Sequence, residues 1–342
     1  MTKVIKLAIT GFGNAVKPLV ELFVSERERL LKNAGVAFTL VGAADSRGAI
    51  VAPEGISAED LLRVRADTGS VSNFPQFGYP NMTALEMIGK CNADLLVEGL
   101  PPNLPTAEPG YSHIKQALQL GMHVVTANKA PLALHWTELN DLAIEAGVQL
   151  RVGSAASAGL PTIEMGRLLG KTGELLEMAG IFNATCQYIL EGMRDGQSYE
   201  DALKDAQARG FVEPDPSMDI DGWDTAMKTV IQANAYWDAG FTLDDVKRTG
   251  IAGLSLSDVQ KAAKEGKTWC LVGRASVENG KKISVSPECL DVKHPLAQAR
   301  WCDKVLLMNT RTLGEQVHFC LGASASGTAG TMLVDIVDIG SK

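Results

Sequence analysis

The sequence predicts an α/β protein with two domains: a doubly wound (Rossmann) parallel-sheet domain, then an α+β domain with an open sheet. Two observations support this fold class. The first half alternates short apolar runs with helical patterns, at lengths typical of a parallel sheet covered by helices on both faces. The second half mixes strand-like and helix-like segments without that alternation. With 342 residues, the chain is long enough for two domains that each bury a core.

Composition and charge exclude several classes of protein. Apolar residues make up 46% of the chain and charged residues 21%, as is ordinary for globular proteins. The net charge of −8 argues against binding to nucleic acid or to anionic membranes. The six cysteines form no C-x-x-C pair and indicate reduced thiols of a cytoplasmic protein. The dispersed histidines predict no zinc site. No apolar run is long enough to span a membrane, and the strand that begins at Val4 leads us to expect no signal peptide.

A dinucleotide-binding fingerprint opens the chain. A strand predicted over residues 4–10 leads into a Gly-x-Gly turn at residues 11–13, a long helical pattern follows, and a second strand over residues 38–43 comes just before Asp45. In such a unit the glycines let the backbone approach a pyrophosphate at the helix N-terminus, and the acid binds the adenosine ribose. A purely structural turn would also use glycine, but the flanking strands and helix favour a cofactor site. Val16 stands at the third glycine position, which predicts looser helix–strand packing or a shifted cofactor.

The choice between NAD and NADP stays open at this stage. Asp45 favours NAD, because a carboxylate in this place binds the free ribose hydroxyls. Arg47 lies two residues further on and would suit the 2′-phosphate of NADP.

The alternation continues through the rest of the first half. Ligands of doubly wound sheets bind beyond the C-terminal ends of the strands, and Lys129 follows one of those ends. Lys129 is therefore either a site residue or an ordinary surface lysine. The predicted segments are strands at 93–99, 123–128 and 148–152 and helices at about 110–120 and 132–144.

The second half begins with a run of small residues, 153–161, before a helix that starts near Thr162. The run is interpreted either as a hinge between domains or as backbone lining a ligand cleft. The other predicted segments are strands at 179–185, 283–286, 305–308 and 316–321 and helices at 199–208, 223–236 and about 329–338.

An acidic loop before the helix at residue 223 carries the strongest candidate chemistry. Prolines at 214 and 216 exclude a helix between them, so we expect an extended loop. Asp221 is predicted to cap the next helix, on which Asp224 and Lys228 are neighbours four residues apart. The pair alone would be typical of a solvated surface ion pair. Its acidic neighbours favour instead a ligand that has an ammonium group and a reactive oxygen. The acidic residues of the loop are Glu213, Asp215, Asp219 and Asp221.

Taken together, several segments resemble the homoserine dehydrogenase family and keep its order. They are GFGN (11–14), ADS (44–46), VVTANKAPLA (124–133), GLP (159–161), EPDP (213–216) and GWDTAMK (222–228). The resemblance implies a Rossmann domain of residues 1–152 with 323–342, to which the last helix returns. It also implies a catalytic and dimerisation domain of residues 153–322. The implied protein is a short form without a C-terminal regulatory domain, a cytoplasmic homodimer in the biosynthesis of threonine and methionine.

The activity implied by the resemblance is the NAD(P)-dependent interconversion of homoserine and aspartate 4-semialdehyde. Lys228 would be the general acid/base, Lys129 the second active-site lysine, and Asp224 a carboxylate of the same catalytic group. An ammonium near the substrate's carbonyl oxygen stabilises the developing alkoxide and supplies its proton. The implied substrate-binding residues are Glu213, Asp219 and Thr185. The implied cofactor-binding residues are Gly11, Phe12, Gly13, Asn14, Ala15, Val16, Asp45, Ser46, Arg47, Gly99, Leu100, Pro101, Lys129 and Ser324.

The sequence departs from the family's pattern at a few positions. Gly153 stands where the family has a glutamate that helps hold a monovalent cation. Backbone carbonyls of Ala156, Ala158 and Leu160 would bind a cation only weakly, so no metal site is expected. The other departures are Leu100 for a threonine, Ala184 for a glycine, Phe211 for a tyrosine and Ser324 for a glycine. They lie around the expected cofactor and substrate and indicate a divergent member of the family. Two alternatives stay open: a dehydrogenase for another small amino or hydroxy acid, and a cofactor-binding sensor without catalysis.

Overall fold

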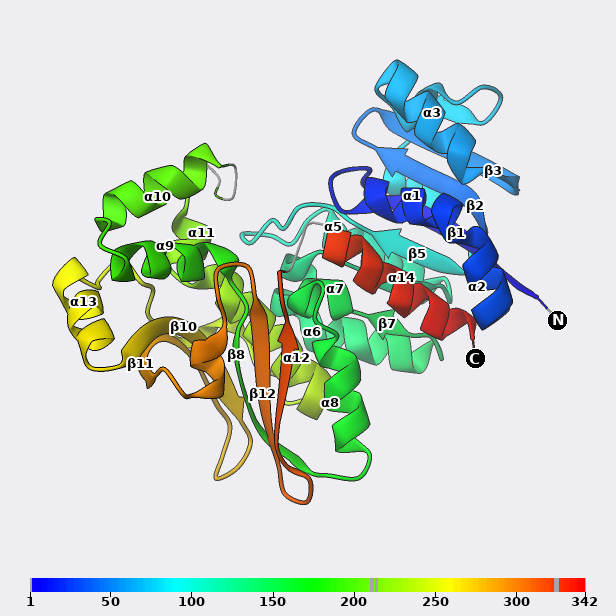
Figure 1. The fold of residues 1–342 in the computed structure, drawn as a ribbon. Coiled ribbons are helices and arrows are strands. Elements are labelled where there is room, and N and C mark those ends of the chain that lie inside the picture. The colour runs from blue at the N-terminus through cyan, green and yellow to red at the C-terminus, as the bar shows by residue number, and fades with distance from the viewer. Residues whose placement is uncertain (1, 210–211, 213–214, 323–325, 342) are drawn as a thin grey trace. The chain divides into compact units, whose positions relative to one another are not determined.

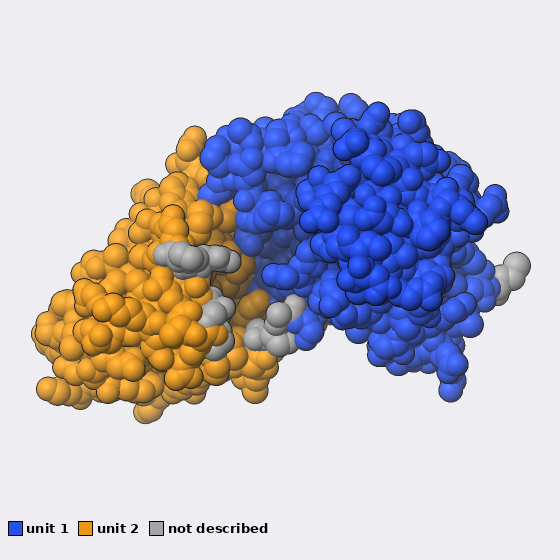
Figure 2. Space-filling model, turned by 90° about the horizontal axis from the view of Figure 1, so that it is seen from above, with its two compact units in different colours: residues 1–159, 325–342 blue, residues 160–324 orange. Residues whose placement is uncertain are grey.

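The computed structural model describes residues 2–209, 212, 215–322 and 326–341. The chain divides into two compact units, residues 1–159 with 325–342 and residues 160–324 (Figure 2). The predicted domains differ from these units mainly in residues 153–159. This segment belongs to the first unit, because helix α7 (Gly153–Ser157) is buried and contacts helix α14 (Ser326–Gly340).

The first unit is built on a seven-stranded sheet with the order β4-β3-β2-β1-β5-β6-β7 (Figure 1). The strands from β2 to β7 in this order run parallel, which confirms the predicted doubly wound α/β fold. Strand β5 is buried along its whole length, as is typical of a strand covered on both faces. The parallel strands are β1 (Lys3–Thr10), β2 (Val36–Asp45), β5 (Leu95–Glu98), β6 (His123–Thr126) and β7 (Leu150–Arg151).

Two antiparallel strands at one edge of this sheet were not predicted. They are β3 (Gly48–Ile56) and β4 (Gly78–Pro80). Strand β3 contains Pro53 and two glycines, which in sequence indicate a loop. Pro53 is tolerated because it lies where the pairing with β2 is irregular.

The helices of the first unit fall into two groups. Helix α1 contacts both α3 and α14, and side chains of β1 such as Leu7 and Ile9 pack with α1 and α14 in one core. In the second group, helix α5 contacts both α4 and α6. The single long helix predicted after residue 13 is two helices, which meet at Glu26. Their bounds are α1 (Val16–Ser25), α2 (Arg27–Ala34), α3 (Ala58–Thr68), α4 (Ala84–Ile88), α5 (Gly110–Gln119) and α6 (Lys129–Glu145), with a 3-10 turn at Val71–Asn73.

The second unit is built on an open six-stranded sheet with the order β13-β12-β8-β10-β11-β9. Its pairs are antiparallel apart from β11 with β9, as expected for an α+β unit. The strands are β8 (Leu175–Ile181), β9 (Lys247–Arg248), β10 (Lys267–Ser276), β11 (Lys282–Asp291), β12 (Lys304–Thr310) and β13 (Gly314–Cys320). The helices are α8 (Thr162–Gly170), α9 (Ala184–Arg194), α10 (Tyr199–Ala208), α11 (Ser217–Ile220), α12 (Trp223–Trp237) and α13 (Leu256–Lys264), with 3-10 turns at Leu243–Asp245 and Pro295–Gln298.

Three local predictions for the second half were wrong. The strand expected over residues 179–185 ends at Ile181, and helix α9 follows from Ala184. The loop after Pro216 is not extended throughout, because Ser217–Ile220 forms a helical turn. Asp221 does not cap α12: Gly222 occupies that position in a left-handed conformation, with φ of 83°. No helix within the described ranges is both long and apolar enough to cross a membrane.

Candidate active site

The two glycines of the first turn have different surroundings. Gly11 has φ of 81°, a left-handed conformation that favours glycine, and its N–H donates to the carbonyl of Ala44 at 3.0 Å. A Cβ atom on Gly11 would lie 3.1 Å from the backbone of Gly99. A Cβ atom on Gly13 would meet no heavy atom of the described residues within 4 Å. Gly11 therefore allows two loops to pack closely, whereas Gly13 leaves its backbone open to a ligand.

Of the two outcomes predicted from the valine at the third glycine position, looser helix–strand packing is not found, and a shifted cofactor stays a prediction. Val16 is the first residue of α1 and is fully buried. A Cβ atom on Gly99 would lie only 2.2 Å from Cγ2 of Val16. The third glycine of the fingerprint normally leaves space for close packing of the helix on the strands. Here Gly99, directly after β5, leaves the space that the side chain of Val16 occupies.

A cavity of about 460 Å³ lies beside this turn. Ala15, at the N-cap of α1, has no polar side chain with which to cap the helix, so the first N–H groups of α1 suit an anion such as a pyrophosphate. The cavity brings together most of the predicted cofactor residues. Its lining is Gly11, Phe12, Gly13, Ala44, Asp45, Ser46, Arg65, Ala84, Gly99, Leu100, Pro101, Pro109 and His113. The N–H groups at the start of α1 and the open backbone at Gly13 fit a dinucleotide.

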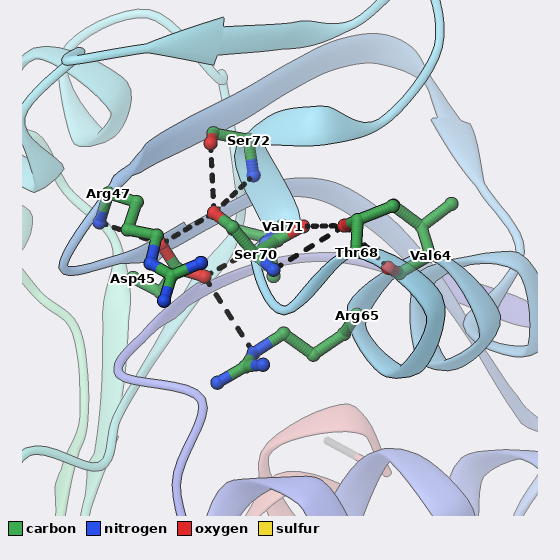
Figure 3. Close-up of polar contacts among 8 residues, drawn as sticks. All are labelled: Asp45, Arg47, Val64, Arg65, Thr68, Ser70, Val71 and Ser72. Atoms are coloured by element: carbon green, nitrogen blue, oxygen red, sulfur yellow. Dashed lines mark hydrogen bonds and ion pairs between the residues drawn. The ribbon is translucent and has the colours of Figure 1, made fainter.

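The end of β2 is organised around the carboxylate of Asp45 (Figure 3). Its Oδ1 accepts hydrogen bonds from the backbone N–H of Arg47 at 2.9 Å and from Oγ of Ser70 at 3.0 Å. Its Oδ2 accepts from the N–H of Val71 at 2.9 Å and lies 3.7 Å from Nε of Arg65. The side chain of Asp45 is only 8% exposed.

Arg65 of α3 is therefore the cation that accompanies Asp45 in the cavity. Sequence reasoning singled out Arg47 for this place, but Arg47 is exposed and contacts Asp45 through its backbone. The signal that would have found Arg65 is a basic residue on the helix after β3. Asn14 is exposed on the turn before α1.

A second carboxyl group in the first unit, that of Glu98, was missed by sequence reasoning. Glu98 ends β5 and is fully buried. It accepts hydrogen bonds from Oγ1 of Thr126 at 2.7 Å, the N–H of Leu100 at 3.1 Å and Nδ2 of Asn128 at 3.3 Å. Burial raises the pKa of Glu98 to about 7, although these hydrogen bonds oppose the shift. Lys129, half-buried, follows Asn128 and is the first residue of α6.

In the second unit, Lys228 and Asp224 form an ion pair one helical turn apart on α12. Nζ of Lys228 lies 2.6 Å from Oδ2 of Asp224 and donates a second hydrogen bond to the carbonyl of Phe182 at 2.7 Å. The two side chains are only 14% and 13% exposed. The pair is therefore largely desolvated, unlike a surface ion pair, and the ammonium group is held by two elements at once.

Asn183, which sequence reasoning missed, joins this pair to a second carboxylate, that of Asp219. Its Nδ2 donates to Oδ1 of Asp219 at 2.5 Å and to Oδ2 of Asp224 at 3.0 Å. Its Oδ1 accepts from the N–H of Cys186 at 2.9 Å, which caps α9. Burial, and next the charge of Asp224, raise the pKa of Asp219. Thr185, in the first turn of α9, is buried and hydrogen-bonds to Asp219, which opposes that shift.

The turn between α11 and α12 is fixed by the segment that contains β9. The guanidinium of Arg248 stacks 3.7 Å from the ring centre of Trp223, and its Nη1 donates to the carbonyl of Asp221. A Cβ atom on Gly250 would lie 2.2 Å from the carbonyl oxygen of Ile220, so this backbone packs directly on the turn. These contacts hold the turn that joins Asp219 on α11 to Asp224 on α12.

Some predicted site residues lie outside the described residues: Glu213, Ser324 and, among the departures, Phe211. Gly153 begins α7, and its N–H donates to Oδ2 of Asp335 at 3.2 Å. Within the part of the chain that the structure describes, no group of three or more His, Cys, Asp or Glu residues is arranged to hold a metal ion.

The chain is similar to proteins of one family throughout its length. The family model described as homoserine dehydrogenase matches residues 161–337. An NAD(+)-dependent homoserine dehydrogenase from Pseudomonas canavaninivorans is 32% identical over 98% of this chain and 96% of its own. Among solved structures, a putative homoserine dehydrogenase from Archaeoglobus fulgidus has a TM-score of 0.87 and 32% identity, covering 98% of this chain and 99% of its own. A hyperthermophilic archaeal homoserine dehydrogenase in complex with NADPH has a TM-score of 0.81 and 26% identity, covering 98% and 97%.

Proposed function

The chain belongs to the homoserine dehydrogenase family, and we propose that it interconverts homoserine and aspartate 4-semialdehyde by hydride transfer. It is an NAD(P)-dependent oxidoreductase. In our proposal the first unit binds the dinucleotide and the second unit binds the amino acid. One observation carries the proposal most directly: Asn183 connects the Lys228–Asp224 pair to Asp219, so an ammonium donor and two carboxylates share one network.

We assign the acid/base role to Lys228. An ammonium group has three N–H donors, and two of them are directed to Asp224 and to the carbonyl of Phe182. The third suits the substrate's carbonyl oxygen, where it would stabilise negative charge and deliver a proton. A nicotinamide dinucleotide held by the first unit would supply or accept the hydride at the carbon of that carbonyl. Asp224 would keep the ammonium group of Lys228 oriented.

Asp219 and Glu213 are proposed to bind the substrate's α-ammonium group, with Thr185 beside them. The position of Asp219 supports this, since it lies in the same network as Asp224 and hydrogen-bonds to Thr185. Lys129 is proposed as the second active-site lysine of the first unit, at the C-terminal edge of the parallel sheet.

The test of this assignment is Lys228→Ala. We expect turnover of homoserine to fall by roughly two to four powers of ten, the usual contribution of general acid–base catalysis. Binding of the reduced cofactor, measured by its fluorescence, should be unchanged, because Lys228 belongs to the second unit. Turnover close to that of the wild type would refute the role of Lys228.

We propose that Asp45 and Arg65 decide between NAD and NADP. A 2′-phosphate near Asp45 is repelled by that carboxylate, whereas the guanidinium of Arg65, 3.7 Å from Asp45, attracts it. Arg65→Ala should weaken the binding of NADP about tenfold or more relative to the binding of NAD, the loss expected for a charge-assisted hydrogen bond. Asp45→Ala should shift the preference towards NADP. Equal effects of Arg65→Ala on kcat/KM for both cofactors would contradict this assignment.

We also propose that the chain acts as a cytoplasmic homodimer in the biosynthesis of threonine and methionine. Apolar side chains exposed in and next to β13 support an interface there: Phe319 is 40% exposed and Leu321 75%. Light scattering should give about twice the mass of the 36.4 kDa chain. A monomer mass at micromolar concentration would contradict the dimer.

A further inference from the structure

We propose that Glu98 is a positioning residue that fixes both the cofactor loop, residues 99–101, and the start of α6 at Lys129. One buried carboxylate would then set the geometry of dinucleotide binding and of a site lysine together. The inference rests on the proposed function, because the loop matters to turnover only if the first unit binds a dinucleotide.

The hydrogen bonds of Glu98 connect the ends of two neighbouring strands. Oε1 accepts from the N–H of Leu100, which follows β5, and from Nδ2 of Asn128, which follows β6. Oε2 accepts from Oγ1 of Thr126 at 2.7 Å, and that hydroxyl accepts in turn from the N–H of Asn128 at 3.0 Å. Both turns at this edge of the sheet are therefore attached to the same carboxyl group.

Helix α5 closes over this carboxyl group. A Cβ atom on Gly110 would lie 2.4 Å from Nδ2 of Asn128 and 3.1 Å from Oε1 of Glu98. Glu98 has no exposed surface, so in the folded protein these donors depend on its oxygens and not on bulk water. An apolar residue of similar size would fill the space but would leave the N–H of Leu100, the amide of Asn128 and the hydroxyl of Thr126 without their acceptor.

The hydrogen bonds of Glu98 reach two parts of the proposed site, the cofactor loop and the start of α6. On one side, Leu100 and Pro101 line the cavity beside the first turn, and a Cβ atom on Gly11 would lie 3.1 Å from Cδ2 of Leu100. On the other side, Oδ1 of Asn128 caps α6 by accepting from the N–H of Ala130 at 3.3 Å. Lys129 lies between these two residues. Loss of the carboxylate would loosen the cofactor loop and the lysine at the same time.

Three variants test this in the full-length protein. Glu98→Gln keeps an acceptor at Oε1 for Leu100 and Asn128, and its amide donates to Thr126. Glu98→Ala removes every acceptor. Asp335→Asn is the matched control, because Asp335 is another buried side chain of the first unit, on α14, and accepts from Gly153. For each variant we would measure the Kd of reduced nicotinamide cofactor by fluorescence, kcat with homoserine, and Tm.

We expect Glu98→Ala to weaken cofactor binding and to lower kcat, each by about tenfold or more, the loss expected when several buried donors lose their acceptor together. Glu98→Gln should stay within about threefold of wild type in both, because Leu100 and Asn128 keep their acceptor and only the hydroxyl of Thr126 has to reverse its hydrogen bond. Asp335→Asn should lower Tm without changing Kd or kcat. If Glu98→Ala lowers Tm but leaves Kd and kcat unchanged, Glu98 is purely structural and the proposal is wrong.

If Glu98→Ala does not fold, Thr126→Val replaces it, since it removes one donor and keeps the carboxylate. A loss of cofactor affinity in Thr126→Val supports the proposal, and unchanged affinity overturns it. Failure of the proposed function looks different: wild-type protein would bind neither cofactor or would not oxidise homoserine.

Discussion

The free energy of unfolding should depend on pH in a way that identifies Glu98. Burial raises the pKa of this group from an ordinary 4.5 to about 7. Between these values the folded protein keeps a proton that the unfolded chain has lost, so unfolding releases a proton. The contribution of Glu98 to stability is therefore greatest at low pH and falls as the pH rises.

The size of this effect follows from the shift. Each unit of difference between the folded and unfolded pKa values corresponds to about 1.4 kcal/mol of unfolding free energy. Most of the interval between the two pKa values lies between about pH 5 and about pH 8. Relative to Glu98→Gln, which cannot titrate, the wild type should lose about 2 to 3 kcal/mol of unfolding free energy over this interval. Contributions of other groups, such as Asp219 with its raised pKa, cancel in the difference between the two proteins.

Urea unfolding of wild type and Glu98→Gln at several pH values measures this difference. Asp335→Asn is the control: its unfolding free energy, compared with the wild type at the same pH values, shows the effect of losing a different buried carboxyl group. A difference between wild type and Glu98→Gln that stays constant from about pH 5 to about pH 8 would refute the reasoning. It would mean that Glu98 has the same pKa in the folded and unfolded states.

Two further predictions follow from the sites. Burial and the charge of Asp224 raise the pKa of Asp219, so this carboxylate is protonated more readily on acidification and KM for homoserine should rise as the pH falls. Asp219→Asn should raise KM at every pH and remove that part of the pH dependence in steady-state kinetics; an unchanged KM would be evidence against a role in substrate binding. Gly99→Ala should cost about 1 to 3 kcal/mol of stability, because its Cβ would lie 2.2 Å from Cγ2 of Val16. Adding Val16→Ala should restore part of that loss in urea unfolding, whereas strictly additive effects would show that the two residues do not compete for one space.

Much of the first unit could be predicted because its signals are local. A strand, a Gly-x-Gly turn and a helix occupy a short stretch, and the acid at Asp45 ends the next strand. The same locality made Asp224 and Lys228 predictable as neighbours, since four residues span about one turn of helix.

What could not be predicted depends on contacts between distant segments. Loose packing was expected at Val16 because the glycine that makes room for its side chain, Gly99, is far away in sequence and could not be recognised as its neighbour. The burial of Glu98 follows from α5 closing over it, and Asn183 meets Asp219 only because α9 and α11 are in contact. Asp221 satisfies the rule for a helix cap, but the sharp turn between α11 and α12 requires a left-handed residue, and Gly222 provides it.

The most direct test of the central claim is the homoserine-dependent change in nicotinamide absorbance of the purified protein, measured with NAD and with NADP. Homoserine should support turnover with at least one cofactor, and Lys228→Ala should abolish most of that turnover. The parallel assays would offer other small amino and hydroxy acids at the same concentration. Turnover with one of these but not with homoserine would contradict the proposed substrate, and cofactor binding without turnover of any of them would contradict catalysis itself.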